Sequence, residues 1–302
     1  MGRNFMCSPL HMTIMSLRNC CRFPITSYSI HLPNGNGCAR LWRRIEARSV
    51  VVFGLTPSTP RSQWICGTPA QEYSRFGVKA EDLKSVPEGI EGLHFHALCE
   101  QNSDTLERLL AVIKKKFGNL LSQVKWVNFG GGQLITGPEY DIDRLCRIIA
   151  DFRREYAVDV YMEPGQAVGF NAGILLSTVL EMVRNEIEIA ILDTSPFAHI
   201  PDILNAPYKP DIIGGGKPNQ FKNTYRLASR SCLSGDIIGD YSFPQPLHRG
   251  SRIMFSDMAS YCAVSNNFFN GIPLPAIAIL TKSNDVRIVR QFGYMDYEAR
   301  LS

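Results

Sequence analysis

The chain has 302 residues, 45% of them hydrophobic and 20% charged, which is typical of a globular protein with a sizeable core. It holds no run of about 18 apolar residues, so we expect no membrane-spanning helix. Residues 71–302 carry 24 basic and 27 acidic side chains, and this mildly acidic balance gives no electrostatic basis for binding nucleic acid.

Residues 1–70 differ in composition from the rest. They contain eight Arg, no Lys and one acidic residue, and their apolar residues follow no sustained period. An Arg-rich, acid-poor composition is typical of a mitochondrial transit peptide, but Pro9, Pro24 and Pro33 would interrupt the helix that such a peptide needs. We therefore expect an aberrant or unstructured segment, as a shifted reading frame or a misplaced gene start would produce. Only the apolar run at 50–55 resembles a buried strand.

The nine cysteines form no Cys-x-x-Cys pair, so we expect no zinc or other metal site. Five of them lie in the first 70 residues, and the other four are scattered singly. In the absence of a secretory signal, reduced thiols and a cytoplasmic location are the expectation.

From residue 71 the pattern becomes regular. Apolar runs predict strands at 92–97, 124–129 and 158–162, and apolar residues at helical spacing predict helices at 103–117 and 141–155. Strands that alternate with helices indicate a parallel sheet or a β/α barrel, whose site lies at the carboxyl ends of the strands. Residues 71–165 hold this alternation, which suits part of a TIM-like β/α barrel as well as an open parallel sheet.

Residues 166–302 form a second region with a different sequence pattern. Short β-type runs occur at 187–192, 252–255, 260–264 and 276–280, with Gly, Pro and Asn between them. This pattern predicts a separate, β-rich C-terminal domain. The fold class is therefore α/β followed by β.

Three features follow predicted strands of the barrel region. Gly130, Gly131 and Gly132 allow a close backbone approach to a phosphate, although a plain turn explains them equally well. A carboxylate such as Glu163 at a strand end suits a protonated ring nitrogen, or it is a solvated turn residue. His96 would stack on a flat ring or be a satisfied core histidine, and His94 shares its face by the period of two.

One loop of the β-rich region also combines reactive groups. Cys232 and Asp236 lie within a single Cys-Leu-Ser-Gly-Asp stretch. This short, glycine-containing loop thus carries both a thiol and a carboxylate. The alternative is a β-turn with an incidental buried cysteine, and the loop alone favours that alternative.

Seven runs in order resemble the carboxynorspermidine decarboxylases, which belong to the alanine-racemase-like group with ornithine and diaminopimelate decarboxylases. The resemblance covers about 230 residues, and Cys-Leu-x-Gly-Asp followed by Ile-Gly-Asp-Tyr is its most specific part. The runs are Gly-Leu-His-Phe-His-Ala-Leu-Cys-Glu (92–100), Asn-Phe-Gly-Gly-Gly (128–132), Glu-Pro-Gly (163–165), Leu-Asp-Thr-Ser (192–195), His-Ile-Pro-Asp (199–202), Cys-Leu-Ser-Gly-Asp-Ile-Ile-Gly-Asp-Tyr (232–241) and Phe-Asn-Gly-Ile-Pro-Leu-Pro (269–275).

The resemblance implies a pyridoxal 5'-phosphate enzyme that converts carboxynorspermidine or carboxyspermidine to the polyamine, in a homodimer with shared sites. His96 would stack on the pyridine ring, Glu163 would bind its nitrogen, and Tyr261 would lie near the phosphate that the three glycines cradle. Cys232 would donate a proton in the partner's site, and Asp236 would contact the distal amine of the substrate.

The chain also departs from the family. Gln133 and Leu134 replace two histidines, Gln166 replaces a glutamate, and residues 228–231 replace Gly-Gly-Pro-Thr. The lysine that anchors the cofactor is missing, because the first lysine is Lys79 and no later one matches the family's position. We therefore expect this chain to be inactive. The alternatives are a truncated product or pseudoenzyme that binds partners through the dimer surface, and a diaminopimelate-decarboxylase-like enzyme.

Overall fold

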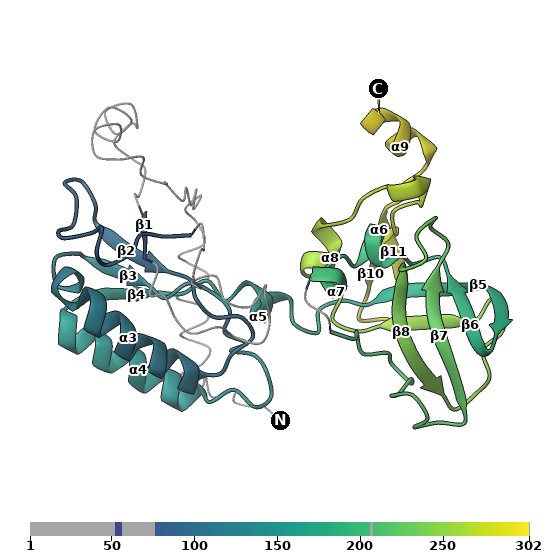
Figure 1. Cartoon of the computed structure of the whole chain (residues 1–302), viewed down its shortest axis with the longest axis horizontal. Coiled ribbons are helices and arrows are strands. Elements are labelled where there is room, and N and C mark those ends of the chain that lie inside the picture. The colour runs from purple at the N-terminus through teal and green to yellow at the C-terminus, as the bar shows by residue number, and fades with distance from the viewer. Residues whose placement is uncertain (1–51, 56–75, 206–207, 302) are drawn as a thin grey trace.

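The computed structural model describes residues 52–55, 76–205 and 208–301, which form two bodies (Figure 1). The expectation of an aberrant segment falls mostly outside the described residues. Within it, β1 (Val52–Leu55) is a strand, as the apolar run predicts. No helix in the described part of the chain is long and apolar enough to cross a membrane.

The first body is a parallel sheet in the order β1-β2-β3-β4. Its other strands are β2 (Gly92–Phe95), β3 (Trp126–Asn128) and β4 (Asp159–Tyr161), each shorter than predicted. Gly92 pairs with Trp126 in the register of β2 and β3, and a Cβ at Gly92 would overlap the indole ring. The sequence therefore needs glycine where the bulky ring crosses the neighbouring strand.

Two helices cover one face of this sheet: α3 (Ser103–Leu121) and α4 (Ile142–Tyr156) (Figure 1). The side chain of Asn102 accepts from the amide of Ser103 to cap α3, and it also accepts from the amide of Asp141 at the start of α4. One asparagine thus fixes both helix starts beside each other.

The helix faces form the core of the first body. The apolar face of α3 is wholly buried, whereas in α4 Leu145, Ile148 and Phe152 are buried and Ile149 is only half-buried. Phe95, Phe129 and Phe152 are fully buried. The ring centroids of Phe95 and Phe129 lie 5.4 Å apart, and those of Phe129 and Phe152 lie 5.0 Å apart. Each such ring contributes about 1.5–3 kcal/mol by its burial.

The second body is a five-stranded sheet in the order β8-β7-β6-β5-β9 (Figure 1). Its core shares no residue with that of the first body. The strands are β5 (Leu175–Asn185), β6 (Ile187–Leu192), β7 (Asn223–Ser229), β8 (Ile237–Phe243) and β9 (Arg252–Phe255). Four short helices flank these strands: α5 (Gly165–Gly169) precedes β5, α6 (Pro196–His199) and α7 (Asp202–Asn205) lie between β6 and β7, and α8 (Tyr261–Val264) follows β9.

The prediction of a strand at 260–264 is wrong, since these residues form α8. Cys262 of this helix is buried in the second core, and the Ser265 hydroxyl donates to the carbonyl of Tyr261 at 2.7 Å. Tertiary packing of Cys262 therefore overrides a local preference for β-structure. The strands predicted at 187–192 and 252–255 are confirmed as β6 and β9.

The chain continues through η1 (Phe269–Gly271) into a two-stranded ribbon of β10 (Ile277–Leu280) and β11 (Val286–Arg290), then α9 (Tyr294–Leu301). The ribbon and α9 project from the second body (Figure 1). Every residue of both ribbon strands is exposed. A hairpin without a packed face is only marginally stable in water.

Candidate functional site

The carboxyl ends of β2, β3 and β4 bring together the polar residues that the sequence singled out. His94, Asn128 and Tyr161 are directly in register across the three strands. Glu163 follows β4 by two residues, and its backbone amide donates to the carbonyl of Gly130 at 2.9 Å. The parallel sheet therefore builds one site from residues up to 69 positions apart in sequence.

The carboxylate of Glu163 lies between two neighbours, and Asn128 orients it by a hydrogen bond. Its Oε1 accepts from Asn128 Nδ2 at 2.7 Å, while its Oε2 lies 3.6 Å from His94 Nε2. The Glu163 side chain is 34% exposed, so Oε2 has room to accept a hydrogen bond from a ligand. Asn128 is itself fixed, because its Oδ1 accepts from the amide of Gly130 at 2.9 Å.

The structure distinguishes the two histidines that the sequence left unranked. His94 is partly buried, and its Nε2 has no hydrogen-bond partner within the described residues. His96 is exposed, and its Nδ1 accepts from the amide of Gly131 at 2.9 Å. His96 therefore presents its ring at the surface of the site, in a fixed orientation that suits stacking.

Burial sets the protonation of both rings. Desolvation lowers the pKa of His94, which Glu163 raises and His96 lowers further. Desolvation also lowers the pKa of His96 against the opposing effect of Glu163. The net lowering of both pKa values favours the neutral imidazoles at pH 7.

The triple glycine serves the packing of the strand ends. A Cβ at Gly131 would lie 2.5 Å from the carbonyl oxygen of Glu163, and one at Gly132 would overlap the carbonyl oxygen of Leu98. The amides of Gly130 and Gly131 donate to side chains of the site itself. These two amides thus hold Asn128 and His96 in place, and both already donate to side chains of the site.

Gln166 follows Glu163 by three residues, whereas the other candidate, Tyr261, lies on α8 of the second body. The Gln166 side chain, a departure from the family pattern, donates from Nε2 to Glu100 Oε1 at 2.8 Å and so links α5 to the turn after β2. Tyr261 is 68% exposed at the start of α8, and the preceding Ser260 packs against Gly169 of α5. Tyr261 therefore lies on a helix that begins beside the end of α5.

Cys232 and Asp236 lie in the turn between β7 and β8, in the other body. Cys232 is exposed and reduced. Asp236 is 1% exposed, and its carboxylate accepts from the Ser195 hydroxyl and from the amide of Phe197. The two candidates of one loop thus have opposite environments.

Sequence reasoning missed Asn128, Ser195 and His199, although all three lie in the runs that carry the family resemblance. Asn128 lies two residues before Gly130, so by the two-residue period of a strand both lie on the same side of the strand end. The sequence could therefore have identified Asn128 as a candidate site residue. Ser195 and His199 carry no local signal for their long-range partners, since Asp236 lies 41 residues beyond Ser195 and Pro273 lies 74 residues beyond His199.

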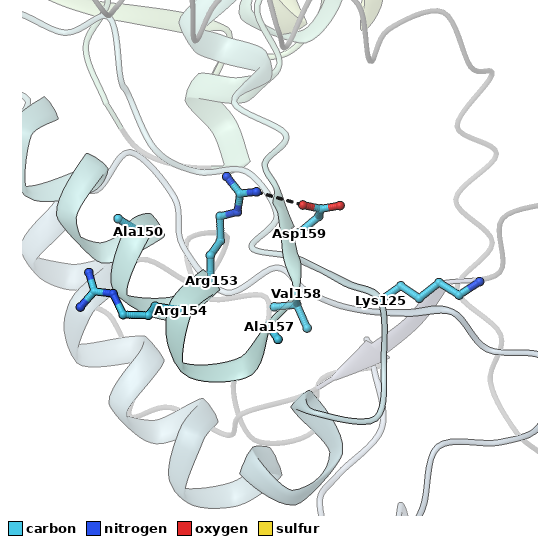
Figure 2. A pocket seen from close by; sticks show the side chains of 7 residues that line it. All are labelled: Lys125, Ala150, Arg153, Arg154, Ala157, Val158 and Asp159. Carbon is cyan, nitrogen blue, oxygen red and sulfur yellow. Dashed lines mark hydrogen bonds and ion pairs between the residues drawn. The ribbon is translucent and has the colours of Figure 1, made fainter.

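An open groove of about 590 Å³ lies at the opposite end of the strands. Figure 2 shows Arg153 pointing toward Asp159, with Lys125 directed away. Arg153 pairs with Asp159 at 3.2 Å and Arg154 with Asp151 at 2.9 Å. Because these cations have carboxylate partners and strand starts rarely carry catalytic groups, the groove is not a candidate active site.

Residues 12–259 match the family model described as "Pyridoxal-dependent decarboxylase, C-terminal sheet domain". The chain is 43% identical over 246 residues to a carboxynorspermidine/carboxyspermidine decarboxylase of Campylobacter jejuni, covering 77% of this chain and 64% of the relative. It is 42% identical over 236 residues to a carboxyaminopropylagmatine decarboxylase of Synechocystis, covering 77% and 61%.

A solved structure agrees with these matches. The crystal structure of carboxynorspermidine decarboxylase from Campylobacter jejuni, complexed with norspermidine, superposes with a TM-score of 0.74 and 38% identity, covering 83% of this chain and 69% of that one. The chain thus spans slightly less than two thirds of the length of the two curated relatives described above.

Proposed function

Since the chain belongs to the pyridoxal-dependent decarboxylases, we propose that its strand-end site serves the decarboxylation of a carboxylated polyamine, such as carboxynorspermidine or carboxyspermidine. The observation that carries this proposal is the oriented carboxylate of Glu163, set beside the exposed ring of His96. The names of the two curated relatives support the substrate class, since both act on carboxylated polyamines.

The residues of the site fit the pyridine part of pyridoxal phosphate. Glu163 would accept a hydrogen bond at Oε2 from the protonated ring nitrogen, and His96 would cover one face of the ring. When bound, the cofactor supplies an electron sink for the pair that is left as carbon dioxide departs. Asn128 would keep the Glu163 carboxylate directed at the ring, and the lowered pKa values of His94 and His96 favour uncharged imidazoles beside it.

One group of the reaction is not supplied by these residues. The first lysine of the sequence is Lys79, and the strand ends of the described site carry none. The proposal therefore includes that the 302 residues by themselves bind the cofactor without a covalent anchor and turn over no substrate. A small primary amine in solution can take the chemical place of a lysine side chain, which makes the idea testable.

The test uses the purified chain with pyridoxal phosphate and carboxynorspermidine. We expect saturable cofactor binding in an absorption titration and carbon dioxide release no faster than with cofactor alone. Added ethylamine should raise the release above that background, and Glu163→Ala should abolish the increase. Failure of the chain to bind the cofactor would contradict the proposal. Borohydride reduction onto one lysine, with turnover in the absence of amine, would show that the anchor lies within the chain.

We further propose that the assembly is a homodimer, with Cys232 of one copy reaching the strand-end site of the other. The exposed ribbon supports a covered surface, since Ile277, Leu280 and Val286 are 48%, 68% and 69% exposed. Cys232 would then deliver the proton that replaces the carboxyl group, and Tyr261 would lie near the phosphate. A reduced thiol is consistent with a cytosolic place of action.

The dimer is tested by sedimentation. Ile279→Lys and Val286→Lys in the ribbon should shift the chain toward monomer, because each buries a charge in the interface. Ile213→Lys is the matched control, since Ile213 is 52% exposed in the segment beside β9 and outside the ribbon. A monomeric wild-type chain at high concentration would contradict this part of the proposal.

A further inference from the structure

The carboxylate of Asp236 is bound from within its own subunit. Ser195 Oγ lies 2.8 Å from Oδ2 and 3.0 Å from Oδ1, and the amide of Phe197 donates to Oδ1 at 3.2 Å. Ser195 Oγ in turn accepts from the amide of Ala198 at 3.1 Å. A carboxylate that is 1% exposed and has these donors is a structural anchor for the first turn of α6.

The same turn binds the segment that precedes the ribbon. The His199 ring accepts at Nδ1 from the amide of Ser195 at 3.2 Å, so its Nε2 carries the proton and donates to the carbonyl of Pro273 at 3.1 Å. Asn267 donates from its side chain to the carbonyl of Phe197 at 2.7 Å and from its amide to that of Ala198 at 2.9 Å. The α6 turn thus fixes residues 267–273.

The segment 267–273 reaches back to the loop that carries the thiol. The amide of Cys232 donates to Asn270 Oδ1 at 2.9 Å, and Asn270 has a φ of 54°, in the left-handed region that Asn tolerates better than most residues. On its other side the loop is closed by the amide of Asp236, which donates to the carbonyl of Leu233 at 3.0 Å. The loop that carries Cys232 is therefore held at both of its ends, by Asn270 at one end and by Asp236 at the other, within one continuous hydrogen-bond network.

We propose that Asp236, acting through Ser195 and the α6 turn, is a positioning residue for the thiol of Cys232 and does not contact the substrate. Asn270 is the second positioning residue and holds the other end of the same loop. The role of the thiol in catalysis rests on the proposed function, whereas the positioning of the thiol does not. Asp236 therefore takes a place different from the substrate contact that the family resemblance implies.

The first test is hydrogen exchange of the purified chain, measured by mass spectrometry. Asp236→Ala removes the acceptor of Ser195 and Phe197, and exchange of the segments 195–199 and 230–236 should rise about tenfold or more, the factor expected when a charge-assisted hydrogen bond is lost. Asp240→Ala is the matched control. Asp240 lies four residues after Asp236, within β8, and pairs with Arg226 on a half-exposed face. It should leave both segments unchanged.

The second test reads the thiol itself. The rate of Cys232 alkylation is followed against pH, with the exposed Cys146 of the other body as internal reference. Asn270→Gly keeps the left-handed backbone but removes the acceptor, and it should raise the Cys232 rate about threefold. Asn270→Asp keeps the acceptor and should restore the wild-type profile. Cys146 should be unchanged throughout.

These outcomes separate positioning from general stability and from the proposed function. Unchanged exchange at 230–236 in Asp236→Ala, or an Asn270→Gly profile identical to wild type, would overturn the proposal. If Asp236→Ala does not fold, Asp236→Asn and Asn270→Gly carry the same test, since each keeps part of the network. Neither measurement requires turnover, so a chain that fails to bind pyridoxal phosphate still gives a decisive answer.

Discussion

The two bodies of this chain hold their functional residues by different means. In the first body, His94, Asn128 and Glu163 follow strands of one parallel sheet, and helices α3 and α4 cover only the face away from them. In the second, Cys232 lies on a turn whose position depends on buried polar contacts from α6 and from residues 267–273. The first site is placed by the regular geometry of strands, and the second by individual hydrogen bonds.

This difference teaches where each site is vulnerable. A strand-end residue keeps its place as long as the apolar core keeps the strands in register, so core mutations threaten the site more than single polar ones do. A residue on a turn loses its place when one buried hydrogen bond is broken, because the donors left behind are costly to leave unpaired. The following predictions test this contrast.

The largest effect is expected from the core of the first body. Phe129→Ala removes a fully buried ring that packs against Phe95 and Phe152, at a cost of about 3–5 kcal/mol in the free energy of unfolding. Because the two cores share no residue, only peptides of the first body should unfold earlier in urea, as read by hydrogen exchange. Phe255→Ala in the second core is the mirror control, and equal shifts of both bodies in either variant would show that they unfold as one.

A smaller effect is expected at the strand-end carboxylate. Glu163→Gln keeps an acceptor for Asn128 but removes the charge, so the affinity for pyridoxal phosphate should fall by about tenfold or more. Absorption titration measures the affinity. Glu155→Gln, which alters an ion pair with Lys114 on the helix surface, should bind like wild type. Equal binding by Glu163→Gln would remove the ring-nitrogen contact from the proposal.

The pH dependence of stability should be visible in both bodies. Burial lowers the pKa of His199 below its ordinary value of 6.5, as it does for His94 and His96. The unfolded chain then binds more protons than the folded one, so the stabilisation is complete above pH 6.5 and is lost as the pH falls below it. Urea unfolding between pH 8 and pH 5.5 measures the loss, and NMR titration of the imidazoles measures the three pKa values. A chain equally stable at both pH values would contradict the assignment.

The smallest effect is expected for an exposed ion pair of the second body. Arg226 and Asp240 face each other across β7 and β8, with their side chains 38% and 37% exposed. Asp240→Asn should therefore change the free energy of unfolding by about 1 kcal/mol or less. A loss as large as that for Asp236→Ala would mean that burial does not distinguish the two carboxylates of this hairpin.

The contrast between the bodies also explains which elements were predictable. In the first body the helical spacing of Leu106, Leu110 and Ile113 and the apolar strands are local signals, and they gave the elements correctly except at their ends. In the second body, strands β5, β7 and β8 were not predicted. Strand β8 contains Gly239 at a φ of 151° beside a register shift, and glycine weakens the pattern by which a strand is read.

The sequence by itself determined the family, the alternation of strands and helices in the first body, and the candidates His96, Glu163 and Cys232, because these depend on neighbouring residues and on motif order. Only the tertiary structure decided that Asn128 directs the Glu163 carboxylate, that His96 rather than His94 is exposed, and that Asp236 is buried against Ser195. These relations join residues 35 and 41 positions apart. Burial and hydrogen bonding between such residues arise only when the strands pair, and no local pattern encodes them.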